Sequence, residues 1–145
     1  MTLINISRMI KSMRIEKVFL GGTCNDSTWR NKLIPLLKID YFNPVVDDWT
    51  PEFQDEEYRQ KEICKYQLYV ITPRMTGVFA IAEIIESVHT SDVKTVVYVM
   101  ETDAEYSFTE GQIRSLNAVK NLAAKHGGII CSSLEEVANI LNGNN

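Results

Sequence analysis

The sequence contains no apolar run near the ~20 residues that a membrane-spanning helix needs. The first 14 residues mix apolar and basic side chains and lack the continuous apolar core of a signal peptide. Dense Lys/Arg clusters are also missing, and the formal net charge is -4. Because nucleic-acid affinity rests largely on phosphate neutralisation, we expect a cytoplasmic protein that binds neither a membrane nor bulk DNA or RNA.

Cysteine and histidine are scarce and scattered. The cysteines are Cys24, Cys64 and Cys131, an odd number with no CxxC spacing and no Cys/His pair. This pattern argues against a disulfide framework and against a zinc site. The phosphate-binding fingerprints GxGxxG and GK[ST] are absent as well, which argues against a dinucleotide or a nucleoside triphosphate. We therefore predict reduced thiols, no metal and no cofactor.

What the chain does have is the composition of a folded domain. Its 145 residues are 45% hydrophobic and 23% charged, close to the globular average, and the length suits one core. We predict one domain over residues 15–145, preceded by an N-terminal arm over residues 1–14.

Apolar β-rich runs alternate with segments of helical period. The expected strands are 17–21, 39–43, 66–72, 94–100 and 127–131, and the expected helical segments are 27–38, 51–65, 78–89, 109–126 and 132–142. Ser27 is the expected N-cap of the first helix, which Pro35 could shorten. This alternation predicts an α/β fold, a single-domain flavodoxin-like or Rossmann-like five-stranded parallel sheet with helices on both faces.

Ligands of such sheets bind beyond the carboxyl ends of the strands, so the loops to search are 21–28, 43–52, 72–78 and 100–109. In the first of these loops Gly21 and Gly22 would let backbone pass close to a sugar or phosphate, or they simply form a tight turn. In the second, Trp49 could stack on a base while Asp47 or Asp48 accepts hydrogen bonds from ribose hydroxyls. The alternative is a solvated acidic loop with Trp49 in the core.

Glu83 stands out in the helical segment 78–89, because its neighbours in the sequence are almost all apolar. A buried, unpaired carboxylate costs several kcal/mol, so Glu83 is either exposed, together with Glu86, or retained for chemistry. One suitable chemistry is glycosidic cleavage, in which a carboxylate stabilises an oxocarbenium-like transition state or attacks the anomeric carbon. Glu83 would then be the nucleophile, and Asp47 or Asp48 would orient the sugar or handle the proton.

Three runs, VFLGGTCNDSTWRNKLIPLL, YFNPVVDDW and CKYQLYVITPRMTGVFAIAEI, together resemble the nucleoside 2-deoxyribosyltransferase-like family over most of residues 17–90. The resemblance implies Glu83 as the nucleophile and the loop 75–77 above it. It further implies a cradle for sugar or phosphate and a wall near the nucleobase. The corresponding residues are Gly21, Gly22 and Thr23 for the cradle, Asp47, Asp48 and Trp49 for the wall, and Met75, Thr76 and Gly77 for the loop.

The same resemblance implies a nucleoside or nucleoside 5′-monophosphate as the ligand, no metal, and a homo-oligomer in which a neighbouring subunit completes the pocket. The sequence departs from the family pattern at two points. Phe19 and Leu20 stand where a tyrosine near the end of the first strand would contact the nucleophile, and the stretch TGVFAIAE lacks the aspartate that serves the base.

The leading hypothesis is therefore an enzyme that cleaves an N-glycosidic bond or transfers the glycosyl group through Glu83, with Asp48 as the second catalytic candidate. A hydrolase and a transferase both fit, and nicotinamide removal from a dinucleotide is a variant of the same chemistry. Two alternatives stay open: a catalytically inactive nucleotide-binding or regulatory module of the same fold, and a partner protein that binds no small molecule.

Overall fold

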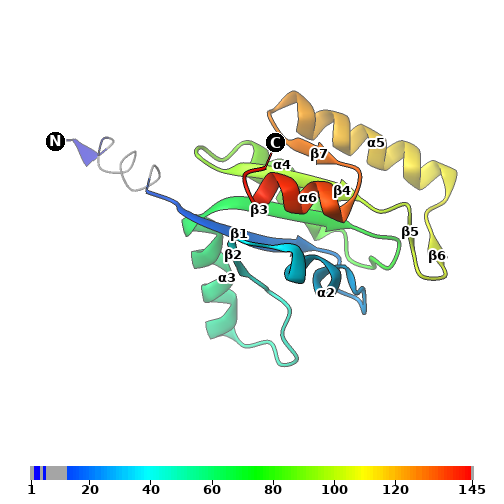
Figure 1. The fold of residues 1–145 in the computed structure, drawn as a ribbon, viewed down its shortest axis with the longest axis horizontal. Coiled ribbons are helices and arrows are strands. Elements are labelled where there is room, and N and C mark those ends of the chain that lie inside the picture. The colour runs from blue at the N-terminus through cyan, green and yellow to red at the C-terminus, as the bar shows by residue number, and fades with distance from the viewer. Residues whose placement is uncertain (1, 4, 6–12, 145) are drawn as a thin grey trace.

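The computed structural model describes residues 2, 3, 5 and 13–144. Five parallel strands form one sheet in the order β2-β1-β3-β4-β7, at the centre of the molecule (Figure 1). They are β1 (Ile15–Gly22), β2 (Asp40–Phe42), β3 (Cys64–Ile71), β4 (Lys94–Val99) and β7 (Ile129–Cys131). The predicted α/β class and five-stranded parallel sheet are confirmed. The predicted arm, residues 1–14, falls mostly outside the described residues, so that division of the chain stays a prediction.

Helices cover both faces of the sheet, as predicted. They are α2 (Trp29–Leu33), the 3-10 helix η1 (Ile34–Leu36), α3 (Pro51–Ile63), α4 (Phe79–Val88), α5 (Glu110–Lys125) and α6 (Leu134–Leu141). In Figure 1, α2 and α6 lie in front of the sheet, whereas the faded α3 lies behind it. No helix in the described part of the chain is long and apolar enough to cross a membrane.

The core consists of two apolar clusters, one on each face of the sheet. Val18 and Leu20 of β1 join the first cluster, with Trp29 of α2 and Val137 of α6. The intervening Phe19 joins the second cluster, which contains side chains of α4 and α5. Because successive strand residues point to opposite faces, the continuous apolar runs of β1 and β3 supply both clusters.

The helix α3 is positioned by its N-cap and by an aromatic stack. Thr50 Oγ1 accepts a hydrogen bond from the Phe53 amide at 3.1 Å, and Pro51 follows at the first helical position. The Phe53 ring stacks on Phe42, which in turn stacks on Phe19 of β1. These contacts attach α3 to the same face of the sheet as α4.

The first helical segment differs from its prediction. The helix α2 begins at Trp29 with Thr28 as its N-cap, and Thr28 makes no side-chain capping bond. Ser27 was the wrong prediction for the cap, because its hydroxyl donates instead to Asp103 Oδ2 at 2.6 Å. A hydrogen bond to a carboxylate is stronger than one to a neutral partner, which explains this preference. As Pro35 suggested, the α-helix is short and gives way to the 3-10 helix η1.

A small antiparallel hairpin after β4 was not predicted from the sequence. Its strands are β5 (Thr102–Asp103) and β6 (Tyr106–Ser107), and Ala104 between them adopts a φ of 53°. Two-residue strands carry too little periodicity to be recognised in a sequence. The hairpin lies at the carboxyl end of β4 and holds Asp103 against the loop after β1.

Gly22 ends β1 and lies close to the backbone of β3. Its φ is 112°, and a Cβ placed there would lie 2.1 Å from the Val70 carbonyl oxygen. Only glycine tolerates both the backbone conformation and this spacing. The close approach brings the loop after β1 against the loop after β3.

We therefore expect Gly22→Ala to lower the free energy of unfolding by roughly 2–4 kcal/mol, through backbone strain and a steric clash. Chemical denaturation measures the change. Gly77→Ala is the matched control, since no atom lies within 4 Å of a Cβ built at Gly77. Equal stability of the two variants would contradict the close-approach argument.

Candidate functional site

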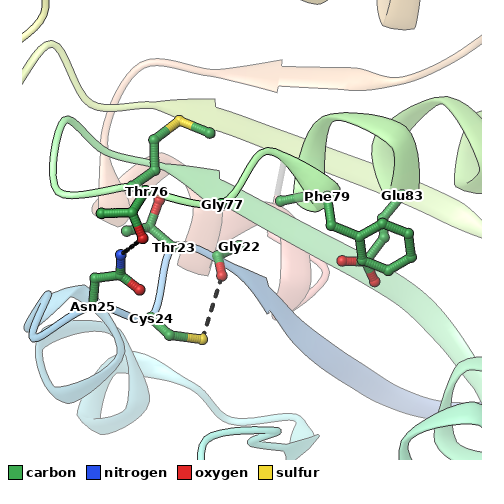
Figure 2. Close-up of a pocket in the computed structure, with 10 residues that line it drawn as sticks. Gly22, Thr23, Cys24, Asn25, Thr76, Gly77, Phe79 and Glu83 are labelled. Carbon is green, nitrogen blue, oxygen red and sulfur yellow. Dashed lines mark hydrogen bonds between the residues drawn. The ribbon is translucent and has the colours of Figure 1, made fainter.

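A cavity lies where the strand order changes direction, between the carboxyl ends of β1 and β3. In sheets of this order, this switch point is where ligands bind. The cavity has a volume of about 180 Å³. Its walls come from the loop after β1, the loop after β3 and the first turns of α4, and its lining residues are Gly22, Thr23, Cys24, Asn25, Met75, Thr76, Gly77, Phe79, Ala80 and Glu83 (Figure 2).

A buried guanidinium group holds the loop after β1 in place. Arg30 of α2 donates to the Leu20 carbonyl at 2.9 and 3.0 Å and to the Thr23 carbonyl at 2.8 Å, while Trp29 Nε1 donates to the same Thr23 oxygen at 2.9 Å. Burial lowers the pKa of Arg30, and the neighbouring Cys24 thiol opposes that effect. The backbone under the cavity is thus held by side-chain donors, and its shape is preorganised.

Hydrogen bonds join the loop after β1 to the end of β3 and to the loop that follows it. The Thr72 amide donates to Thr23 Oγ1 at 3.0 Å, and the Thr23 amide donates to the Val70 carbonyl at 2.9 Å. Near the rim, Asn25 Nδ2 donates to Thr76 Oγ1 at 2.5 Å, as Figure 2 shows. These bonds bring together two segments that lie about fifty residues apart in the sequence.

Asp103 connects the hairpin to both loops. Besides accepting from Ser27, it faces Arg74 of the loop after β3, with 3.7 Å between Asp103 Oδ1 and Arg74 Nε. The Arg74 guanidinium also lies over the Tyr106 ring, 4.6 Å from its centroid. From the sequence we expected only that the loop 100–109 reaches this edge of the sheet. The structure shows which of its residues contact the loops of the site.

Glu83 points from the second turn of α4 toward the cavity, and Figure 2 shows its carboxylate beside the ring of Phe79, one turn earlier. Its side chain is 15% exposed and forms an ion pair with the Nζ of Lys61 at the end of α3. The same Nζ lies 5.4 Å from the Phe19 ring centroid and 6.0 Å from that of Phe79. Glu83 is therefore neither an exposed surface residue nor an unpaired buried charge.

A phenol and a second carboxylate lie near this pair. The Tyr69 hydroxyl donates to Gln67 Oε1 at 2.7 Å and so is committed to a partner other than Glu83. Burial raises the pKa of Tyr69, and the charge of Glu83 adds to the effect. Burial also raises the pKa of Glu57, which lies one turn before Lys61. The charge of Lys61 acts to lower the pKa of Glu57, and the charge of Glu83 acts to raise it. Glu57, Lys61 and Glu83 form one electrostatic cluster.

The structure brings together most, but not all, of the residues singled out in the sequence. The six that line the cavity are Gly22, Thr23, Met75, Thr76, Gly77 and Glu83. Gly21 lies within β1, where a Cβ would come 2.5 Å from the Tyr69 ring, and it does not line the cavity.

Asp47, Asp48 and Trp49 are exposed in the loop after β2 and do not line the cavity either. Trp49 is 60% exposed, so the alternative that placed it in the core is wrong. The role of Asp47, Asp48 and Trp49 beside the base stays a prediction.

Sequence reasoning missed Cys24, Asn25, Phe79 and Ala80 among the lining residues, and Lys61 as the partner of Glu83. Cys24 and Asn25 lie in the loop 21–28, which the sequence already indicated as a place to search for the site. Lys61 gave no signal, because its position relative to Glu83 depends on how α3 and α4 pack. Among the described residues, no group of three or more His, Cys, Asp or Glu side chains could hold a metal ion.

Comparison with known proteins assigns the chain to a family. The family model described as nucleoside 2-deoxyribosyltransferase like matches residues 15–104, more than half of the chain. The chain therefore belongs to the nucleoside 2-deoxyribosyltransferase-like family, as the sequence resemblance indicated. No curated protein and no solved structure matches it.

The three cysteines differ sharply in their surroundings. Cys24 is exposed at the cavity, whereas Cys64 and Cys131 are buried. Burial raises the pKa of both buried thiols to about 11. Since the thiolate is the reactive form, both remain protonated and unreactive at neutral pH and would ionise only as the pH approaches that value.

We expect iodoacetamide at pH 7 to alkylate Cys24 alone in the folded protein, with peptide mapping by mass spectrometry as the readout. All three thiols should react once the protein is unfolded in guanidinium, which is the control. Labelling of Cys64 or Cys131 at a rate similar to that of Cys24 under native conditions would contradict the burial described here.

Proposed function

We propose that this protein cleaves the N-glycosidic bond of a nucleoside or a nucleoside 5′-monophosphate, with Glu83 as the nucleophile. The observation that carries the proposal is the place of Glu83: a largely buried carboxylate on the wall of a cavity at the switch point of the sheet. Membership of a nucleoside 2-deoxyribosyltransferase-like family supports the same chemistry.

In this proposal the sugar occupies the cavity with its anomeric carbon against Glu83. The cavity is smaller than the roughly 300–1,000 Å³ typical of pockets for drug-sized ligands, so it suits the sugar rather than a whole nucleoside. As the bond to the base breaks, positive charge develops on the sugar and the carboxylate stabilises it or attacks to form a glycosyl ester. Water or a second base then takes the glycosyl group.

The segment Gly22–Asn25 and the loop Met75–Gly77 would contact the sugar hydroxyls or a 5′-phosphate. Support comes from the hydrogen bonds that fix both segments and from the polar groups of Asn25 and Thr76 at the rim. Gly21, which precedes Gly22 in β1, would contribute indirectly, because the lack of a side chain lets the Tyr69 ring pack against the strand.

The base would leave on the open side of the cavity, where Phe79 is 70% exposed and available for stacking. Asp47, Asp48 and Trp49 are our candidates for the wall near the base, with Asp48 handling the proton. They would reach it from the exposed loop that precedes Thr50. Val78 is exposed next to Phe79, which is compatible with a homo-oligomer in the cytoplasm whose neighbouring subunit covers this edge.

The second candidate function is a catalytically inactive module that binds a nucleotide in the same cavity. One observation favours it: among the described residues that line the cavity, Glu83 is the only carboxylate, so the lining holds no second carboxyl group to protonate the leaving base. Such a module would bind the ligand without turnover.

To distinguish the two, release of free base would be measured for ribo- and deoxynucleosides and their 5′-monophosphates, with and without an acceptor base. We expect turnover of one substrate class, and a loss of kcat/KM of at least about 1000-fold in Glu83→Gln, because the reacting nucleophile is removed. Glu86→Gln is the matched control: it lies on the same helix but is exposed.

An active Glu83→Gln variant would contradict the assignment of Glu83 as the nucleophile. If the wild-type protein releases no base but binds a member of the panel in calorimetry, the inactive module is the better description. Stimulation by an acceptor base would identify a transferase, and its absence a hydrolase.

A further inference from the structure

The ion pair between Lys61 and Glu83 joins two mostly buried side chains from different helices, α3 and α4. Each side chain is 15% exposed. The pair of Lys65 and Glu16, by comparison, has side chains that are 32% and 64% exposed. A charge pair shielded from water interacts more strongly than one at the surface, because the surrounding dielectric is lower.

The end of α3 that carries Lys61 is itself held by two polar side chains. The Lys61 carbonyl accepts hydrogen bonds from Arg14 Nη1 at 2.7 Å and from Gln67 Nε2 at 3.2 Å. Gln67, which is 5% exposed, also accepts the hydroxyl of Tyr69, which is 1% exposed. These contacts fix the backbone at Lys61, from which the side chain reaches Glu83.

In the described structure, the Lys61 ammonium group has few possible charge partners other than Glu83. The rings of Phe19 and Phe79 lie within 6.0 Å of Nζ, and Glu57 precedes Lys61 by one turn. Burial is the main reason that the pKa of Glu57 is raised, so Glu57 holds its negative charge less readily than an exposed glutamate. The Glu83 carboxylate is the direct partner of Lys61.

We propose that Lys61 is a positioning residue that makes Glu83 a good leaving group, so that the glycosyl group is released rapidly from the enzyme. The inference rests on the proposed function, because it requires that Glu83 becomes glycosylated. It goes beyond that function by assigning the second half of the reaction to a residue on a different helix.

The two half-reactions balance as follows. In the first, a Glu83 oxygen forms a bond to the anomeric carbon while the bond from that carbon to the base nitrogen breaks, and the base leaves with the electron pair and takes up a proton from solvent. In the second, water or an acceptor base attacks the anomeric carbon, and the electron pair of the ester bond returns to Glu83. The attacking group loses its proton to solvent.

Glu83 is negatively charged before the first step and after the second, but neutral as an ester between them. The Lys61 ammonium therefore stabilises the carboxylate and leaves the ester without a charge partner. This opposes formation of the ester to some degree and favours its breakdown. Removing the charge should make the ester persist.

The experiment compares Lys61→Met, which removes the charge, with Lys61→Arg, which keeps it, and Lys61→Gln, which keeps a hydrogen-bond donor without the charge. Lys65→Met is the matched control, because it breaks a Lys–Glu pair away from the cavity. Steady-state kinetics would be measured on the substrate that the wild-type protein turns over. Intact-protein mass spectrometry after acid quench would detect the glycosyl ester.

We expect kcat of Lys61→Met to fall roughly 10- to 100-fold, the rate equivalent of one hydrogen bond to a charged group. The kcat of Lys61→Gln should fall by a smaller factor, because this variant keeps a donor and loses only the charge. Because ester breakdown becomes rate-limiting, KM should fall with kcat and leave kcat/KM unchanged or higher. The quenched variants should carry the added mass of the glycosyl group. Lys61→Arg and Lys65→Met should behave like the wild type.

A merely structural role of Lys61 predicts a different result: kcat/KM falls together with kcat, no ester accumulates, and the unfolding transition moves to lower denaturant. That result, or unchanged kinetics in both neutral variants, would overturn the inference while leaving the proposed function intact. An inactive wild-type protein would overturn the proposed function, and this inference with it.

Discussion

The site depends on the close pairing of β1 with β3. Gly21 lies against the Tyr69 ring and Gly22 against the Val70 backbone, so no side chain separates the two strand ends. The loops that follow are thereby close enough to share hydrogen bonds, and Thr23 makes two of them. The buried Arg30 and Trp29 then hold the first loop from the opposite face. Without this pairing the lining residues would not face one cavity.

Charge at this cavity is arranged by helices rather than by the loops. Glu83 comes from α4 and Lys61 from α3, and both helices pack on the same face of the sheet. In the family that the sequence resembles, a tyrosine near the end of the first strand contacts the nucleophile, and Phe19 and Leu20 stand at that place in this chain. The structure places a phenol, Tyr69, near Glu83, but this phenol donates to Gln67, and an ammonium group pairs with the carboxylate. An ammonium partner adds charge as well as a hydrogen bond, which distinguishes this site electrostatically from one with a neutral donor.

The sequence patterns predicted the fold better than they predicted the site. The predicted strands 66–72 and 94–100 agree to within two residues with β3 (Cys64–Ile71) and β4 (Lys94–Val99), because these strands are largely buried on both faces and so appear in the sequence as continuous apolar runs. The glycine turn and Glu83 were recognised because each departs from its neighbours in the sequence. Ser27 was assigned to the wrong partner, because a cap and a distant carboxylate compete for one hydroxyl and only Asp103's position decides between them. The loop after β2 was recognised as polar, but its exposure could not be deduced.

The amino-acid sequence by itself determined the class of fold, the order of the five sheet strands and the helices along the chain, and the family, since these follow from local periodicity, turn residues and short motifs. The tertiary structure alone decided which side chains meet: Lys61 with Glu83, Asn25 with Thr76, and Asp103 with Ser27. The physical reason is that periodicity is a property of neighbouring residues. Contacts between residues 22 to 76 positions apart depend instead on strand register and helix packing.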